Sequence, residues 1–143
     1  MTAKLVVLVR TDLGMSAGKL GAQVGHAVEC VREQAPTKCV LEALEQYYAT
    51  GRTKIVLGVD SQEELERLVS QAKEEGHTTY TIVDEGRTEL APATMTCAAI
   101  GPSLSSKVNT ITGHLKRYKE KPKKDTHECK PTKCSAPARI MKF

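Results

Sequence analysis

The chain has 143 residues, the size of one domain with room for a short tail. Its 40% of apolar residues excludes a disordered polymer and a bundle of membrane helices, and its 3% of aromatic residues argues against a stacking-based reader of single-stranded nucleic acid. Of the formal net charge of +4, residues 1–118 contribute −1 and residues 119–143 contribute +5.

The N-terminus and the cysteines bear on the cellular compartment. Met1 leads directly into a strand-like run without the pattern of a signal or transit peptide, so we expect a cytoplasmic protein. The odd number of cysteines, five, argues against a disulfide framework. No apolar run approaches the roughly 20 residues that span a bilayer, so we expect no membrane partner.

Apolar patterning predicts the elements in chain order. Residues 4–10 form a near-continuous branched run, typical of a strand buried on both faces of an α/β sheet. Helical spacing follows, ended first by Pro36 and then by Gly51, and a capping box at Ser61 opens a further helix. The full pattern predicts strands at 4–10, 54–59, 78–83 and 94–100, and helices at 18–34, 37–49, 61–76 and 103–118.

The order of these elements predicts the fold class. Helices between strands imply parallel crossovers, whereas the closely spaced third and fourth strands suggest an antiparallel pair. We therefore predict a single α/β domain over residues 1–118, a four-stranded mixed sheet flanked by helices on both faces. Residues 119–143, with seven lysines and three prolines, predict a basic, disordered tail.

The first candidate site lies on the first helix. Lys19, Gln23 and His26 follow one another at i, i+4 and i+7, so they share one helix face. This helix begins where a buried strand ends, the edge at which α/β sheets bind ligands, and a helix N-terminus favours anions such as phosphate. An ordinary solvated helix face is the alternative. Leu20 follows Lys19 where a phosphate-binding P-loop requires Ser or Thr, which argues against a nucleoside triphosphatase.

The second candidate site follows the third strand. Asp84 stands at its carboxyl end, Thr88 follows across a turn with Gly86, and Thr96 lies in the next strand. A carboxylate beside a lysine and a hydroxyl is a plausible arrangement for orienting water in hydrolysis. The alternative is a structural turn in which Asp84 caps local amides.

The tail holds a third set of polar residues. His127, Cys129 and Cys134 offer three close ligands for zinc, but their spacing is irregular and a structural site needs a fourth. Free thiols in a solvated tail are the alternative reading, so we expect no bound metal.

Together, five segments resemble the type II peptidyl-tRNA hydrolase family of archaea and eukaryotes. The resemblance covers about four-fifths of the chain in the right order. The segments are Leu5-Val-Val-Leu-Val-Arg-Thr-Asp-Leu-Gly-Met15, Gly18-Lys-Leu-Gly-Ala-Gln-Val-Gly-His-Ala27, Asp84-Glu-Gly-Arg-Thr-Glu-Leu-Ala-Pro92, Ile100-Gly-Pro102 and Ile111-Thr-Gly-His-Leu-Lys116.

The resemblance implies an activity and a set of site residues. It implies a small α/β enzyme that hydrolyses the ester joining a peptide to the terminal ribose of tRNA, without a metal or organic cofactor, and a homodimer. The family's proposed active-site residues fall on Lys19, Gln23, His26, Asp84, Thr88 and Thr96. The alternative function is a catalytically silent RNA-binding or protein-interaction module on the same fold.

The chain also departs from the family pattern. Ser16-Ala17-Gly18-Lys19 stands where a Gly-Lys-Gly-Lys run is frequent, so one basic residue is missing. Val24-Gly25 replaces the usual Cys-Ser or Cys-Gly, which speaks against a cysteine nucleophile. Glu85 adds negative charge beside Asp84, where alanine is usual.

Overall fold

The computed structural model describes residues 1–86, 90 and 93–119. In this part of the chain, one mixed sheet has the strand order β2-β1-β4-β3. β1 pairs parallel with β2 and antiparallel with β4, and β3 pairs antiparallel with β4. The predicted four-stranded mixed sheet is therefore confirmed. Its strands are β1 (Ala3–Arg10), β2 (Lys54–Val59), β3 (Thr79–Asp84) and β4 (Thr94–Leu104).

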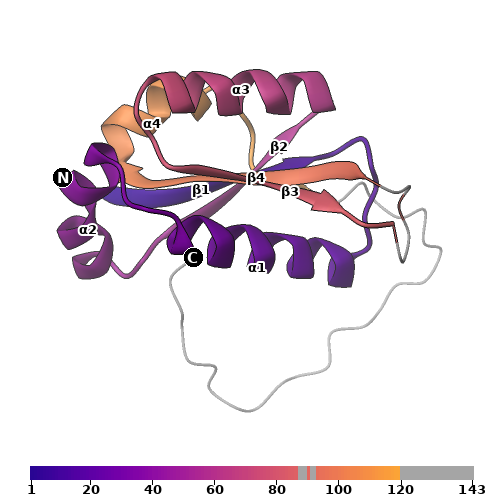
Figure 1. Cartoon of the computed structure of the whole chain (residues 1–143), viewed down its shortest axis with the longest axis horizontal. Helices are drawn as coiled ribbons and strands as arrows, with labels where there is room; N and C mark the ends of the chain where they lie inside the picture. The colour runs from indigo at the N-terminus through magenta and orange to yellow at the C-terminus, as the bar shows by residue number, and fades with distance from the viewer. Residues whose placement is uncertain (87–89, 91–92, 120–143) are drawn as a thin grey trace, which may run out of the picture.

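The helices form one layer on each side of this sheet. α1 and α2 cover one face, and α3 and α4 cover the other (Figure 1), as predicted. None of the described helices has both the length and the apolar character required to cross a membrane. The helices are α1 (Ala17–Glu33), α2 (Lys38–Ala49), α3 (Gln62–Glu74) and α4 (Ser105–Thr112).

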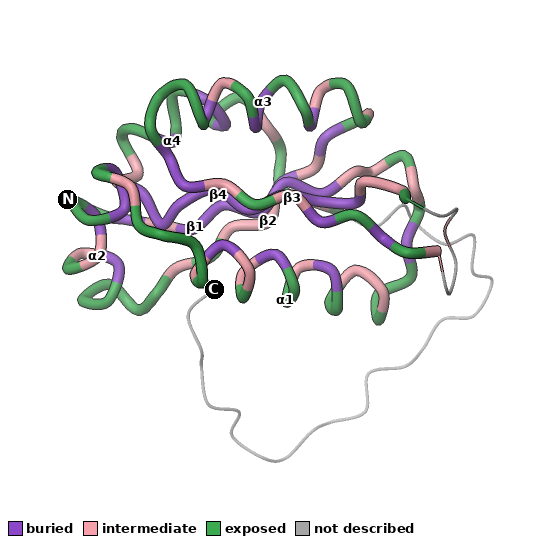
Figure 2. Tube along the Cα trace, in the orientation of Figure 1, coloured by how far each residue is buried: buried purple, intermediate pink, exposed green. Residues whose placement is uncertain are grey.

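β1 is a run of branched apolar side chains because the sheet separates two cores and this strand contributes to both. Leu5, Val7 and Val9 belong to the core beneath α1 and α2, whereas Val6 and Leu8 belong to the core beneath α3 and α4. All five side chains are fully buried. Burying each one stabilises the fold by about 1.5–3 kcal/mol, so the central strand holds both layers to the sheet. Figure 2 shows this concentration of buried residues in the strands and on the inner sides of the helices.

The end of the domain differs from the sequence prediction. β4 continues past Ile100 to Leu104, because residues 103 and 104 pair with the beginning of β1. α4 therefore begins only at Ser105, and it ends at Thr112 rather than near Tyr118. Leu104, which falls within the predicted helix 103–118, packs instead against the core on the α1 side of the sheet.

The segment after α4 lies along the outer edge of β2. Gly58 N donates to the Lys116 carbonyl at 2.9 Å, and Tyr118 N donates to the Val56 carbonyl at 3.0 Å. Leu57 and Arg117 form an isolated antiparallel bridge between these two bonds. Residues 120–143, with His127, Cys129 and Cys134, lie outside the described residues, so the disordered tail stays a prediction.

The topology brings the two candidate site segments to one edge. β1 and β3 both run antiparallel to β4, so they run parallel to each other and their carboxyl ends share one edge of the sheet. α1 follows β1 after a short loop, and Asp84 is the last residue of β3. The first turn of α1 is thereby placed beside Asp84.

Candidate active site

A largely buried ion pair joins α1 to the end of β3. Ser16 caps α1, and its hydroxyl accepts from Lys19 N at 3.3 Å, which places Lys19 in the first turn. Lys19 Nζ lies 2.5 Å from Asp84 Oδ1. Both side chains are largely withdrawn from solvent, with exposed fractions of 12% and 8%. Two residues that the sequence predicted separately thus form one charged unit.

Asp84 is held as a carboxylate by donors on both oxygens. Its Oδ2 accepts from Gly86 N at 2.9 Å, across a turn in which Gly86 has φ 76°. The Lys19 hydrogen bond is the main cause that lowers the pKa of Asp84; burial opposes it, and the Gly86 N–H and the Lys19 charge add to it. A carboxylate with a lowered pKa is a weak base, so this geometry suits orienting a water or holding Lys19 better than removing a proton. The local cap considered in the sequence analysis is present together with the ion pair.

Gln23 is fixed from behind by β4. Thr96 Oγ1 donates to Gln23 Oε1 at 2.6 Å, and both residues are buried. This bond occupies the amide oxygen and leaves Nε2 to donate elsewhere. Among the described residues, no acceptor bonds Gln23 Nε2. The exposed fraction of Thr96 is 0%, so Thr96 supports Gln23 and does not reach the surface.

The neighbouring Cys97 is a core residue. Its Sγ donates to the Gln23 carbonyl at 3.4 Å, and burial raises the pKa of the thiol to about 11. A thiol that stays protonated at neutral pH is a poor nucleophile. Cys97 is therefore part of the core and not a catalytic nucleophile.

Four of the six predicted site residues line one open cleft, which we call the α1–β3 cleft. It has a volume of about 380 Å³. His26 is exposed at its rim and makes no hydrogen bond within the described part of the chain. Thr96 lies beneath the cleft, and Thr88 lies outside the described residues. The lining residues are Lys19, Ala22, Gln23 and His26 of α1, and Ile82, Val83, Asp84 and Glu85 at the end of β3.

A larger hollow lies elsewhere. One of about 610 Å³ lies beside β2 and is lined by Thr11, Asp60 and Lys116 among others. It contains no buried ion pair, whereas the α1–β3 cleft combines a cation, a carboxylate, an amide and an imidazole. Among the described residues, no group of three His, Cys, Asp or Glu side chains is arranged to hold a metal ion. The α1–β3 cleft is therefore the candidate site.

Two features of the cleft were missed in the sequence analysis. Val83 is 52% exposed and forms an apolar wall beside Asp84, although it was assigned only to a strand. The two-residue period of a strand is the signal that could have identified it, because this period places residue 83 on the face opposite residues 82 and 84, which are buried. The bond from Thr96 to Gln23 had no local signal, since 73 residues separate the partners.

The fold and the cleft define a small α/β domain with a polar, hydrolase-type site at one edge of its sheet. The family model described as peptidyl-tRNA hydrolase PTH2 matches residues 3–118. The chain belongs to this family, as its resemblance implied.

Individual relatives agree with this assignment. The chain is 42% identical over 113 residues to a peptidyl-tRNA hydrolase of Methanocaldococcus jannaschii, covering 79% of this chain and 97% of the relative. It is 40% identical over 115 residues to a probable peptidyl-tRNA hydrolase 2 of Dictyostelium discoideum, covering 80% of this chain and 54% of the relative. It is 37% identical over 115 residues to human peptidyl-tRNA hydrolase 2, mitochondrial, covering 80% of this chain and 64% of the relative.

Proposed function

We propose that this chain hydrolyses the ester bond of peptidyl-tRNA at the α1–β3 cleft and releases free tRNA and peptide. Membership of the family supports the reaction and the substrate. The largely buried ion pair between Lys19 and Asp84 is the observation that supports this cleft as the place of reaction. Buried charges are costly unless they are paired, and perturbed carboxylates in clefts are frequent at active sites.

Lys19 is proposed to stabilise negative charge on the substrate. An ammonium group has three N–H donors, and the bond to Asp84 uses one of them. The others are available to the oxyanion of the tetrahedral intermediate or to the terminal phosphate of tRNA. A single positioned donor of this kind contributes a factor of roughly 10²–10³ in rate.

Asp84 is proposed to orient both Lys19 and the attacking water. Its lowered pKa argues against a role as a strong base, whereas its two engaged oxygens give it a defined orientation. The resemblance assigns Thr88 to the same task. The reaction requires only water and side chains, in line with the resemblance, which implies no cofactor.

Gln23, His26 and Thr96 are proposed to position the substrate end of tRNA. The amide Nε2 of Gln23 is suited to donate to an ester or ribose oxygen, because Thr96 occupies its Oε1. Thr96 is thus a positioning residue that acts through Gln23. His26, exposed at the rim, is suited to contact ribose or phosphate.

Release of labelled peptide from peptidyl-tRNA tests this function. We expect Lys19→Ala to lower kcat/KM by a factor of about 10²–10³. Lys107→Ala is the matched control: it also breaks a lysine–carboxylate pair, with Glu42, but on the surface and away from the cleft. We expect the control to retain wild-type activity. Binding of tRNA without release of peptide by the wild type would favour the catalytically silent module instead.

A homodimer and a cytoplasmic location are further proposals. The resemblance supports the dimer, and sedimentation velocity of the full chain measures it directly. Membership of a family that acts on peptidyl-tRNA, a product of translation, supports the cytoplasm. Because the human relative is named a mitochondrial protein, imaging of the tagged chain is the appropriate measurement.

A further inference from the structure

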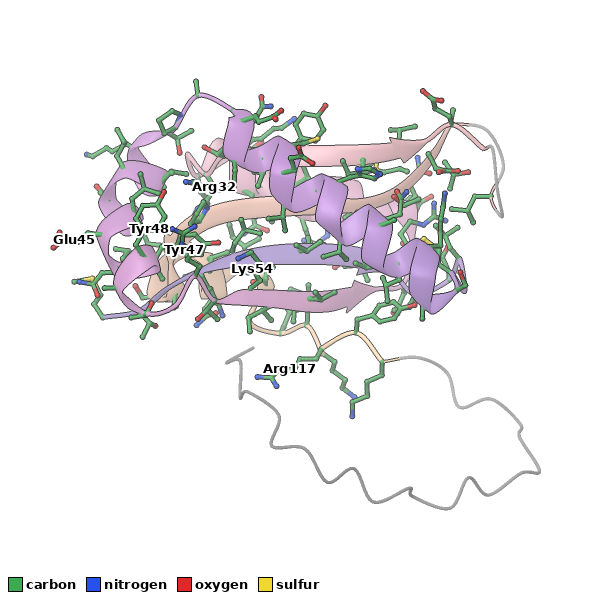
Figure 3. The ribbon with its side chains drawn as sticks, turned by 90° about the horizontal axis from the view of Figure 1, so that it is seen from below. Arg32, Glu45, Tyr47, Tyr48, Lys54 and Arg117 are labelled. Carbon is green, nitrogen blue, oxygen red and sulfur yellow. The ribbon has the colours of Figure 1, made fainter. Side chains whose placement is uncertain are left out.

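Two cations and two tyrosines, Arg32, Lys54, Tyr47 and Tyr48, gather where the C-terminal end of α1 meets α2 and the start of β2 (Figure 3), and a third cation, Arg52, lies beside them. The Arg32 guanidinium lies 5.9 Å from the Tyr47 ring centroid, and its Nη2 donates to the Tyr48 hydroxyl at 2.8 Å. Lys54 Nζ lies 5.6 Å from the Tyr47 ring centroid. The Arg52 guanidinium lies 4.8 Å from the Tyr48 ring centroid. We call these five residues the cation–tyrosine cluster.

The backbone and the core hold the cluster in place. Tyr47 is 2% exposed and belongs to the core beneath α1 and α2. Arg52 has φ 57°, a left-handed conformation that residues other than glycine rarely adopt, and its N–H donates to the Tyr47 carbonyl at 2.8 Å. Tyr48 remains 47% exposed between Arg32 and Arg52. An uncommon backbone conformation thus presents a cation and an aromatic face to solvent.

The charges of this cluster are not neutralised by the described protein. Each of four other cations forms an ion pair with a carboxylate: Arg10, Lys19, Arg67 and Lys107. Within the described residues, no carboxylate pairs with a cation of the cluster, and Glu45 lies at the outer side of α2, away from them (Figure 3). The cations of the cluster repel one another, and their cation–π contacts with the tyrosine rings offset this repulsion only in part. The cluster is therefore a local positive surface on a domain whose residues 1–118 carry a net charge of −1.

The position of the cluster relates it to the α1–β3 cleft. Arg32 follows Lys19 on the same helix by 13 residues, which corresponds to about 20 Å along the axis. The cluster lies on the face of the sheet that α1 and α2 cover (Figure 3). A tRNA whose 3′ end occupies the cleft carries a phosphate at every nucleotide leading away from it.

We propose that the cation–tyrosine cluster binds the phosphate backbone of tRNA while the 3′ end of that tRNA lies in the α1–β3 cleft. This inference rests on the proposed function, which supplies the polyanion. Arginine and lysine side chains bind phosphate oxygens through charged hydrogen bonds. The surface supplies affinity for the body of tRNA, and the cleft supplies the chemistry.

The test compares two triple variants with the same change in net charge. The cluster variant is Arg32→Gln, Arg52→Asn and Lys54→Gln, with asparagine chosen because it tolerates a positive φ. The control variant is Arg67→Gln, Lys73→Gln and Lys107→Gln on the α3 and α4 side of the sheet. Binding of deacylated tRNA is measured over a series of salt concentrations. Hydrolysis is measured with full-length peptidyl-tRNA and with a peptidyl ester of a CCA trinucleotide, which is too short to reach the cluster.

We expect the cluster variant to bind tRNA about tenfold more weakly or worse, with a salt slope reduced by about 2, because each phosphate that the protein no longer binds lowers the slope by roughly 0.7–0.9. Its KM for full-length peptidyl-tRNA rises, while kcat and turnover of the trinucleotide ester stay at the wild-type level. Arg52→Asn alone, which leaves both tyrosines and Arg32 in place, reduces the slope by about 1.

Three results would overturn the proposal: an unchanged salt slope, an equal loss in the control variant, or equal losses on the two hydrolysis substrates. An unchanged salt slope would show that the cluster binds no phosphate. An equal loss in the control variant would show that the effect comes from net charge alone. Equal losses on the two substrates would show that the substitutions affect folding or the cleft. Failure of the wild type to hydrolyse either substrate would instead contradict the proposed function. The tRNA-binding measurement would still decide the role of the cluster in that case.

Discussion

At the scale of single residues, the hydrogen-bond partners of Asp84 set its pKa and therefore its suitability as a base. Lys19 is the main cause that lowers the pKa of Asp84 from its ordinary 3.8. The ion pair therefore contributes stability above about pH 3.8, and this contribution is lost as the pH falls through the lowered pKa. A loss of activity between pH 5 and 8 would consequently report the titration of another group.

Thr96 offers a residue-scale prediction about positioning. Thr96→Val removes the donor to Gln23 Oε1 and leaves that buried oxygen unpaired, at a cost of about 1–3 kcal/mol of stability. We expect kcat to fall about tenfold, since the Gln23 amide is no longer oriented. Thr96→Ser, which keeps the hydroxyl, restores the wild-type kcat.

The control for this prediction is a second buried threonine. Thr112 Oγ1 donates to the Val108 carbonyl at 3.1 Å on the other side of the sheet. Thr112→Val removes a buried hydroxyl without touching the cleft, so kcat should be unchanged. An equal fall in kcat for both variants would show that Thr96 acts only through stability.

Much of the candidate site was predictable at this scale, and the limits have physical causes. The spacing of Lys19, Gln23 and His26 placed them on one helix face, and the edge rule for α/β sheets placed Asp84 near that helix. Direct contact between Lys19 and Asp84 and the support of Gln23 by Thr96 depend on how closely α1 packs against the sheet. Local sequence patterns carry no information on the distance between α1 and the sheet.

At the scale of elements, α1 contains a prediction about stability. Gly21 lies in the second turn of this helix, and nothing lies within 4 Å of a Cβ added to it. Gly21→Ala should therefore stabilise the fold by about 0.5–1 kcal/mol and raise Tm by about 2–4 °C. Thermal unfolding measures this, with Ser70→Ala on the exposed side of α3 as a control of smaller gain. A lower Tm for Gly21→Ala would contradict the open surroundings of this residue.

The elements also show where sequence patterns succeed and fail. The order of strands and helices was correct, because buried runs and capping residues are local signals. The end of β4 was wrong, since residues 103 and 104 become strand only by pairing with β1 about 100 positions earlier. The last helix was predicted too long, because the residues after Gly113 lie extended along β2 instead of completing further turns. Both errors arise from long-range backbone pairing.

At the scale of the whole molecule, two positively charged regions are relevant to tRNA, the cation–tyrosine cluster and the segment 119–143. Deleting residues 119–143 removes a net charge of +5. We expect weaker tRNA binding and a flatter salt dependence, by roughly 0.7–0.9 in slope for each phosphate that the segment binds in the full chain. Peptide release from a CCA trinucleotide ester should be unaffected. An unchanged slope for full-length tRNA would identify the segment as a passive extension.

The segment after α4 has a consequence for how the sheet can grow. Backbone groups at an uncovered sheet edge pair readily with strands of other chains, and residues 116–118 occupy that position beside β2. Among the described residues, the opposite edge, β3, has no such cover and exposes Tyr80 and Val83. Because residues 116–118 occupy the edge beside β2, a strand of another chain can be added only beside β3. Two copies joined through β3 would form a closed pair, and such a pairing would limit open-ended fibre growth.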